Sequence, residues 1–347
     1  MLAAAAGALA DAAGFPIGWI LGPMIVAAAF SVADARPHAP LGLRRFGQLV
    51  VGIAIGLNMT AGAAAHLVTW FPAMAAIGLI SILLAASLSP SVARLGRVDV
   101  KTAYFAMMPG GLAEMANVGS ALGARSEVIS LSQALRASLT VLLVPPLVLA
   151  IAEDGGIVSA GRADPVGWTT LPLLMGASLV GVLLLSRTRV ANAWMLGALA
   201  VTGLLAGGGI VEGRMPAPVL WLGQFFIGLT IGVRFKRDML RRLPWLAAVC
   251  SVFTVLLGAL LFGLAAVLHI VTGLNLGSAM LGASPGGFVE MTLTAQVLHL
   301  DVALVTGFQF VRAFMVNGLA ALIWGWLDRI GWFAVLQRLV GSPPGKP

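Results

Sequence analysis

The stretch PGGLAEM, residues 109–115, recurs as PGGFVEM at residues 285–291. In each copy a proline and two glycines interrupt any helix that passes through, because proline removes a backbone donor and glycine permits tight backbone. A glutamate follows in each copy, Glu114 in the first and Glu290 in the second. A helix break and a carboxylate therefore occur twice in a chain that is otherwise strongly apolar.

The composition is that of an integral membrane protein. Hydrophobic residues make up 59% of the 347 residues and charged residues only 10%, with a mean hydropathy of +1.00. A soluble domain carries roughly 25% charged residues. The charge-free runs at 46–93, 165–186, 190–211 and 215–233 fit helices of about 20 residues that span a bilayer. The single cysteine, Cys250, excludes an internal disulfide.

The two motifs belong to a longer internal repeat. One register, an offset of 176 residues, also places Gly47, Gln48, Gly52 and Gly56 onto Gly223, Gln224, Gly228 and Gly232, and Gln133 and Arg136 onto Gln309 and Arg312. Such a repeat predicts a duplicated fold. We expect a first membrane repeat at 1–160, a second at 161–335 and a cytoplasmic tail at 336–347.

Each half contains the same series of apolar segments. They lie near 1–13, 15–34, 45–60, 69–90 and 126–152 in the first half, and near 166–186, 190–210, 216–233, 244–268 and 302–327 in the second. A segment interrupted by Pro-Gly-Gly, at 101–122 or 277–298, lies between the fourth and fifth segment of each half. Each interrupted segment either crosses the membrane or enters it and returns.

The placement of positive charge distinguishes the two topologies, because Lys and Arg accumulate in cytoplasmic loops. If both interrupted segments are re-entrant, seventeen of the 21 Lys and Arg residues lie inside and two outside. If both interrupted segments cross the membrane, eleven Lys and Arg residues lie inside and eight lie outside. We therefore predict an all-α polytopic membrane protein with two inverted repeats, each of five spans plus one re-entrant hairpin. It would be multi-pass in the bacterial inner membrane, with both termini cytoplasmic. The net charge of +8 then reflects orientation, and no nucleic-acid partner is expected.

The hairpin tips are candidate binding sites, at Gly110 and Gly111 in the first half and at Gly286 and Gly287 in the second. Helices that restart after a break point positive N-terminal ends toward the protein centre, which suits an anionic substrate. The carbonyls of the ending helix suit Na⁺. A kinked structural helix without a ligand is the alternative.

The two glutamates occupy the first turn of the restarted helices. Glu114 and Glu290 either stabilise their own helix N-termini or form a proton or Na⁺ site, since ionisable residues inside a membrane are usually functional. Both interpretations remain open, and they are compatible.

One arginine lies in the middle of the last span of each half. Arg136 and Arg312 are about eleven residues into their spans, which is roughly 16 Å at 1.5 Å per residue. A guanidinium at that depth needs a partner, and we expect a glutamate of the tips or a substrate carboxylate. A structural ion pair is the alternative. Gln133 and Gln309, on the same helical face, could hydrogen-bond a ligand or the hairpin backbone.

The second tip is the more polar one. Ser284, Thr292 and Thr294 stand where the first half has Met108, Ala116 and Val118, so these side chains are candidate contacts for the solute or ion. Pairs of glycines four residues apart, at 52 and 56 and at 228 and 232, predict close helix packing. The four histidines and one cysteine are scattered, and no metal site is expected.

The repeated motifs resemble the bacterial AbrB-type integral membrane protein family, which is built from an AbrB duplication. The likeness rests on PGGLAEM and PGGFVEM, on GWILGPM at 18–24, and on GQLVVGIAIG and GQFFIGLTIG at 47–56 and 223–232. It covers about residues 14 to 330. The resemblance implies two inherited labels, regulator of gene expression and ammonia monooxygenase. It also implies a relation to the cation/proton antiporter and anion transporter superfamily.

These labels can be weighed against the residues. A monooxygenase would need a metal site, and a DNA-binding regulator would need a soluble basic domain; the sequence predicts neither. We expect a secondary active transporter of a small organic anion, coupled to H⁺ or Na⁺, with alternating access around the two hairpins. The alternative is a non-transporting membrane sensor that affects gene expression indirectly. No enzymatic activity and no cofactor beyond a coupling ion are expected. The expected partners are the lipid bilayer and a small solute, and a homo-oligomer remains open.

Overall fold

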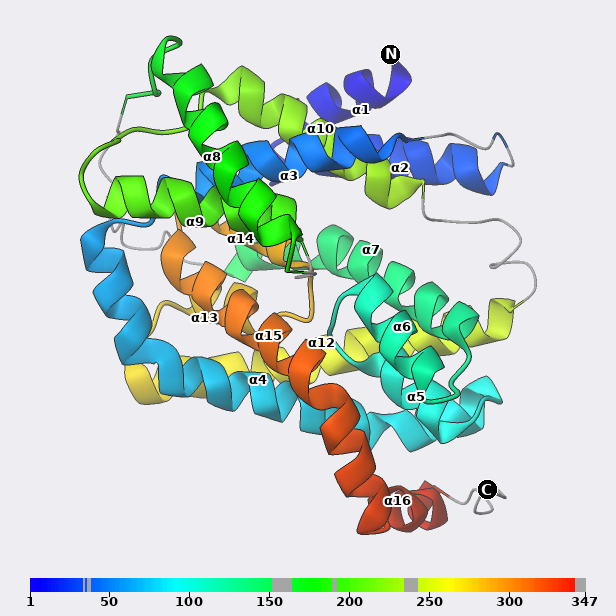
Figure 1. Cartoon of the computed structure of the whole chain (residues 1–347). Helices are drawn as coiled ribbons and strands as arrows, with labels where there is room; N and C mark the ends of the chain where they lie inside the picture. Colours follow the sequence, from blue (N-terminus) through cyan, green and yellow to red (C-terminus); the bar gives the residue numbers. More distant parts are fainter. Residues whose placement is uncertain (34, 36–38, 152–163, 189–191, 234–242, 341–347) are drawn as a thin grey trace. The chain divides into compact units, whose positions relative to one another are not determined.

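The chain folds as an all-helical protein (Figure 1). The computed structural model describes residues 1–33, 35, 39–151, 164–188, 192–233 and 243–340. Within these ranges only helices and their connections occur, apart from one isolated bridge between Pro165 and Arg214. The predicted all-α class is therefore confirmed. The expected boundary between the repeats at residues 160 and 161, and most of the expected tail at 336–347, lie outside the described residues.

Every predicted apolar segment contains a helix. In the first half these are α1 (Leu2–Ala12), α2 (Gly18–Val32), α3 (Leu41–Gly56), α4 (Ala61–Gly96), α5 (Val100–Met107), α6 (Leu112–Ala121) and α7 (Ser126–Ile151). In the second half they are α8 (Thr170–Ser186), α9 (Ala193–Gly207), α10 (Ala217–Gly232), α12 (Pro244–Thr272), α13 (Leu276–Ala283), α14 (Phe288–Val297) and α15 (Val302–Arg329), followed by α16 (Trp332–Val340). The break between α5 and α6 and the break between α13 and α14 fall on the two Pro-Gly-Gly stretches.

Within the described part of the chain, four helices are long and apolar enough to cross a membrane. They are His66–Gly96 within α4, then α7, α12 and α15. The other six predicted spans form helices of 11–17 residues. At 1.5 Å per residue these reach roughly 26 Å at most, which is less than the hydrocarbon core of about 30 Å.

The helices group into two compact units. Unit 1 comprises Met1–Phe71, Pro145–Arg237 and Val289–Gly307, and unit 2 comprises Pro72–Val144, Asp238–Phe288 and Phe308–Pro347. Each unit draws on both halves of the sequence. The chain passes between the units inside α4, at Pro72, inside α7, at Pro145, and inside α15, between Gly307 and Phe308.

Unit 1 is held together by glycine faces that recur in the two halves. A Cβ added at Gly52 of α3 would overlap the carbonyl oxygen of Met195 in α9. A Cβ added at Gly228 of α10 would overlap the carbonyl oxygen of Ile20 in α2. One turn later, a Cβ added at Gly56 would overlap the side chain of Thr202 in α9, and one added at Gly232 would overlap the carbonyl oxygen of Met24 in α2. The predicted close packing of these glycines is confirmed, and each face covers a helix from the opposite half.

An aromatic contact of unit 1 recurs with a changed partner. The guanidinium of Arg45 lies 5.5 Å from the ring centroid of Trp194. At the corresponding positions of α10 and α2, Trp221 stacks on Trp19 with 5.6 Å between the ring centroids. A cation–π contact in one pairing thus replaces a ring stack in the other, at the same place between two helices.

In unit 2, α5 and α6 form an antiparallel helical hairpin and lie side by side (Figure 1). At its open end Lys101 Nζ donates to the carbonyl of Leu122 at 3.0 Å, and the backbone N–H of Arg125 donates to Thr102 Oγ1 at 2.9 Å. Midway, Gly119 of α6 lies against Phe105 of α5. The chain therefore turns back on itself at residues 108–111.

The hairpin is anchored to the end of the chain by aromatic rings. Tyr104 of α5 lies 5.1 Å from Trp324 of α15 and 5.8 Å from Phe333 of α16, measured between ring centroids. Its hydroxyl donates to the carbonyl of Ala320 at 2.8 Å. This buried cluster holds α5 against α15 and α16.

The local backbone conformation repeats with the same register as the sequence. The left-handed residues Arg97 and Gly123 correspond to Gly273 and His299, which are also left-handed. The residue before each of α5 and α13 caps its helix, with Asp99 accepting from the N–H of Thr102 and Asn275 from that of Ser278. The starts and ends of the broken segments are thus set by equivalent local features in both halves.

Candidate functional site

The first part of the site is the C-terminal end of α5. The last carbonyls of a helix have no N–H partner within the helix, and here side chains of α7 supply the donors. Gln133 Nε2 donates to the carbonyls of Phe105 at 3.1 Å, Ala106 at 3.4 Å and Met108 at 2.8 Å. Gln133 is almost fully buried. Its amide therefore covers the end of α5.

Arg136, three residues further along α7, covers the break itself. Its Nη1 donates to the carbonyl of Met108 at 3.1 Å, and its Nη2 donates to the carbonyl of Gly110 at 2.6 Å. The planar guanidinium thus bridges two carbonyls on either side of Pro109. This contact fixes the path of the chain through the tip.

The second half repeats this arrangement atom for atom. Gln309 Nε2 donates to the carbonyls of Leu281 at 2.6 Å, Gly282 at 3.4 Å and Ser284 at 3.2 Å. Arg312 donates from Nη1 to the carbonyl of Ser284 and from Nη2 to that of Gly286, the latter at 2.7 Å. Each donor and each acceptor lies 176 residues after its counterpart. We call each set of carbonyls with its glutamine and arginine a tip cage.

One difference between the two tip cages is not apparent from the sequence repeat. Ser132 Oγ donates to the carbonyl of Ala106 at 2.9 Å in the first cage. The corresponding residue in the second half is Phe308, whose ring lies against Gly282; a Cβ there would come within 3.0 Å of Phe308. A comparison of the halves passes over Ser132 because its counterpart is unrelated in chemistry.

Arg312 has hydrogen-bond partners that the sequence does not reveal. Instead of the expected carboxylate, its acceptors are two carbonyls and the side-chain oxygen of Gln309, which lies 2.7 Å from Nη2. Backbone carbonyls at a helix break are strong hydrogen-bond acceptors. The sequence does not show which carbonyls these are, because every residue has one. The prediction that the glutamines contact the hairpin backbone is confirmed. Arg312 is 2% exposed and Arg136 6%.

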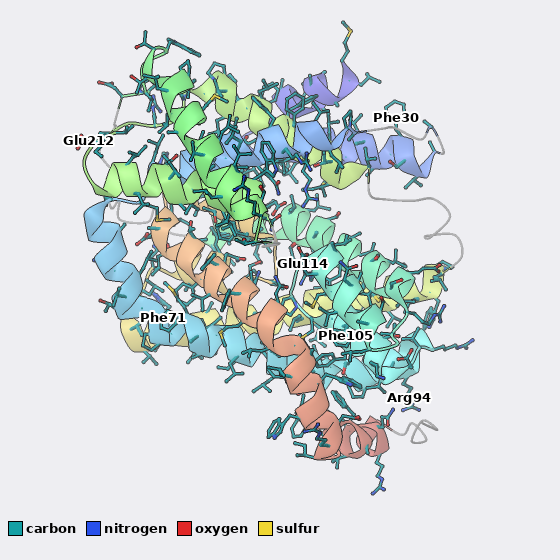
Figure 2. All side chains as sticks on the ribbon, in the orientation of Figure 1. Phe30, Phe71, Arg94, Phe105, Glu114 and Glu212 are labelled. Carbon is teal, nitrogen blue, oxygen red and sulfur yellow. The ribbon has the colours of Figure 1, made fainter. Side chains whose placement is uncertain are left out.

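Glu114 lies at the start of α6 (Figure 2). Gly111 is the N-cap of this helix, and a Cβ added there would overlap the Glu114 carboxylate. The carboxylate thus folds back over its own helix N-terminus, at the position where a glutamate completes a capping box. Its side chain is only half-buried, so it is also within reach of a ligand or a proton.

The remaining predicted residues are divided between the units. Ser284 lies in the second tip, where its hydroxyl accepts from the N–H of Gly286 at 3.3 Å, and Gly287 directly precedes α14. Glu290, Thr292 and Thr294 belong to unit 1 and are buried. Thr294 donates to the carbonyl of Glu290 at 2.8 Å, and Thr306 donates to Thr292 at 3.5 Å. The two threonine hydroxyls therefore already take part in hydrogen bonds of the protein.

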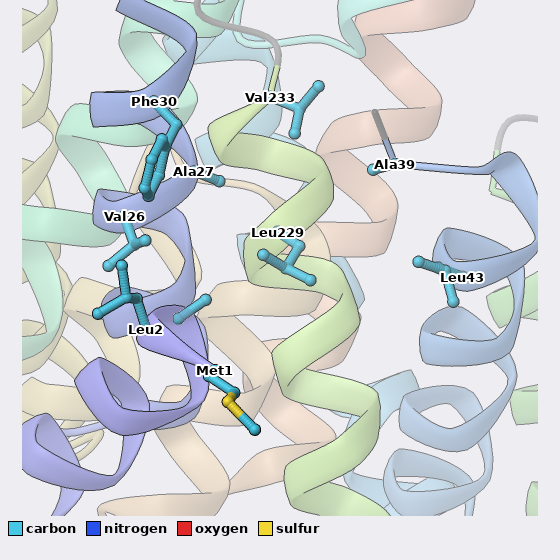
Figure 3. A pocket seen from close by; sticks show the side chains of 10 residues that line it. Met1, Leu2, Val26, Ala27, Phe30, Ala39, Leu43, Leu229 and Val233 are labelled. Carbon is cyan, nitrogen blue, oxygen red and sulfur yellow. The ribbon is translucent and has the colours of Figure 1, made fainter. Parts of the chain in front are cut away.

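A pocket in unit 1 is of a different kind. It has a volume of about 440 Å³ and lies among α1, α2, α3 and α10. Figure 3 shows that apolar side chains surround it, among them Leu2, Val26, Phe30 and Leu229. Its walls lack the charged or polar groups that would orient an anionic solute. Among the described residues, no three His, Cys, Asp or Glu side chains gather where they could hold a metal ion.

Comparison with known proteins identifies relatives over nearly the whole length. The model of the family described as "Transition state regulatory protein AbrB" matches residues 19–328. The uncharacterized protein YhjN of Bacillus subtilis (strain 168) is 27% identical over 344 residues, which are 92% of this chain and 89% of that protein. A protein of Escherichia coli (strain K12), named as a candidate regulator AbrB, is 26% identical over 311 residues, 87% of each chain. The family resemblance carried by the repeated motifs is confirmed.

Proposed function

The chain belongs to the AbrB family, and from that premise we propose that it is a secondary active transporter of a small organic anion in the membrane. The observation that carries the proposal is the pair of tip cages, in which helix breaks are held by buried Gln and Arg side chains among long apolar helices. Non-helical backbone at membrane depth persists only where it is buried in protein or lines a wet cavity. Broken helices at equivalent positions of a repeated sequence are typical of secondary transporters.

The substrate class follows from charge. Helices α6 and α14 restart directly after the tips, and a helix N-terminus favours an anion. The acceptors of Arg312 are neutral, so its positive charge is not cancelled by them. We propose two inverted repeats, each with a re-entrant hairpin, and a substrate site beside the tips. Coupling would be to H⁺ or Na⁺, and no catalytic reaction is proposed.

Alternating access is supported by the division of the chain. Unit 2 contains the α5–α6 hairpin and both tips, whereas α1, α2, α3, α8, α9 and α10 form the body of unit 1. We propose that unit 2 moves against unit 1 as a scaffold. The glycine contacts of unit 1 suit a rigid scaffold, because closely packed backbones leave little room for rearrangement.

A second candidate is a non-transporting membrane sensor that binds the same anion and affects gene expression indirectly. The observation that favours it is the printed name of the Escherichia coli relative, a candidate regulator. Such a protein would use the same tips for binding and would not complete a transport cycle.

Uptake into proteoliposomes distinguishes the two candidates. Purified protein is reconstituted and tested with a panel of radiolabelled carboxylates and amino acids, under an inward H⁺ gradient, an inward Na⁺ gradient or neither. We expect gradient-driven accumulation of at least one anion. Binding of an anion by the detergent-solubilised protein, without flux in vesicles that pass a leak control, would instead favour the sensor.

A further inference from the structure

The tip cages resemble cation sites in their acceptors but hold an arginine instead of an ion. In broken-helix transporters, the carbonyls of a helix that ends in the membrane coordinate Na⁺. Here the corresponding carbonyls are those of Met108 and Gly110 at the end of α5, and those of Ser284 and Gly286 at the end of α13. In both cages the group that bridges the carbonyls is a guanidinium.

The guanidinium suits this position for two physical reasons. The C-terminal end of a helix carries a partial negative charge, so a cation there is stabilised. An arginine side chain stays protonated even when buried, and its rigid fork offers two parallel donors. One guanidinium therefore satisfies two carbonyls and the helix dipole together, as a dehydrated ion would, and needs no ion from solution.

The surrounding side chains hold the guanidinium in place. Gln309 is fully buried, and its amide is used from both ends: Nε2 donates to the carbonyls of Leu281 and Ser284, and Oε1 accepts from Arg312. The glutamine thus ties Arg312 to the same helix end that the arginine covers. A mobile ion would have to displace this whole arrangement.

We propose that Arg136 and Arg312 are built-in cations that replace Na⁺ at the two tips. In each cage the guanidinium already bridges the two carbonyls that an ion would bind. One consequence rests on the proposed transport function: the coupling ion is a proton and not Na⁺. The proposal that the two arginines take the place of Na⁺ holds whether or not the protein is a transporter.

Thermal unfolding of the purified protein in detergent tests the replacement. The melting temperature is measured in NaCl, KCl, choline chloride and low guanidinium chloride at equal ionic strength. We expect the wild type to melt at the same temperature in NaCl and in choline chloride. Arg312→Ala should melt roughly 5 °C lower than the wild type in choline chloride, because it removes the donor to the Gly286 carbonyl and one of the two donors to the Ser284 carbonyl. Guanidinium or Na⁺ should recover part of that loss.

Two further variants keep the test decisive. Arg312→Lys retains a positively charged side chain, so its melting temperature should not respond to Na⁺. This variant tests the proposal if the alanine variant does not fold. Arg338→Ala removes an exposed arginine of α16 and should show no cation response. Specific stabilisation of the wild type by Na⁺ would overturn the proposal. So would an Arg312→Ala protein that folds and responds to neither cation.

Uptake separates this inference from the proposed function. With an H⁺ gradient the wild type should accumulate substrate equally well in Na⁺ and in choline buffer. Uptake that requires Na⁺ would contradict the assignment of the coupling ion while supporting transport. Absence of all uptake would count against the transporter and leave the melting experiment as the test of the built-in cations.

Discussion

At the scale of single residues, a buried charge is tolerated only where polar groups replace its water. Arg136 and Arg312 meet this requirement with backbone carbonyls that lie free because a proline and two glycines end the helix. The break and the arginine therefore satisfy each other. An arginine without the break would lack these acceptors, and the break without the arginine would leave the carbonyls of Gly110 and Gly286 without this donor.

The role of Glu114 can be tested by separating its charge from its capping. Glutamine also completes a capping box, so Glu114→Gln should leave the melting temperature nearly unchanged and abolish H⁺-coupled uptake. Glu114→Ala also removes the side chain that lies over the helix N-terminus and should cost about 0.3–1 kcal/mol of stability. Melting curves and uptake are measured on the same preparations. If the Glu114→Gln protein still shows H⁺-coupled uptake, Glu114 is not the coupling site and acts only at its helix N-terminus.

The sequence allows the site residues to be predicted, but not all of their contacts. Gln133, Arg136, Gln309 and Arg312 are recognisable because polar residues recur at one offset in apolar helices. The acceptors of the arginines are not, because a backbone carbonyl is present at every residue and only the folded chain shows which ones lack a partner. Ser132 is missed for another reason, since its counterpart Phe308 carries no hydroxyl.

At the scale of helices, glycine determines how closely the elements approach. In α3 and α10 it lies where a carbonyl of the facing helix would meet a Cβ, so the spacing of the glycines fixes which turns are in contact. The sequence predicts such packing from the four-residue spacing. It does not predict the partner, because α3 packs on α9 and α10 packs on α2, across the repeat and not within it. The glycine spacing is the same whichever helix lies opposite.

Substitution of these glycines should weaken unit 1. We expect Gly52→Ala to lower the stability by about 1–3 kcal/mol, the range for an overpacked core, and Gly228→Ala to do the same. Gly176→Ala is the matched control: a Cβ at Gly176 of α8 meets nothing within 4 Å, and alanine favours a helix over glycine. Thermal unfolding in detergent measures all three. Equal melting temperatures for Gly52→Ala and Gly176→Ala would contradict the packing argument.

At the scale of the whole molecule, two of the points where the chain passes between the units are prolines inside helices. α4 passes from unit 1 to unit 2 at Pro72, and α7 returns at Pro145. A proline inside a helix lacks the N–H of one turn, which makes that point easier to bend. Composition and charge predict the membrane class and the repeat, but not this division. It depends on contacts between segments that are distant in the sequence.

Pro72 should therefore affect transport rate more than binding. If unit 2 moves against unit 1, we expect Pro72→Ala to slow uptake roughly tenfold, the effect of about 1.4 kcal/mol on a barrier, with the affinity for the anion unchanged. Pro90→Ala is the control, because Pro90 lies in the same helix but within unit 2. Initial uptake rates and equilibrium binding are compared. A similar decrease of the initial uptake rate in both variants would contradict the proposal that Pro72 is a hinge.

The exchanged glycine faces of unit 1 also bear on the origin of the chain. The face of α3 needs a helix like α9, and α9 corresponds in the repeat to α2. A gene that encoded only the first half would thus produce a polypeptide in which the glycine face of α3 is uncovered. The α2 helix of a second copy could cover that face. Two such subunits would complete each other as a symmetric pair. Fusion of two copies into one reading frame would then free each half to diverge, as the replacement of Arg45 on Trp194 by Trp221 on Trp19 illustrates.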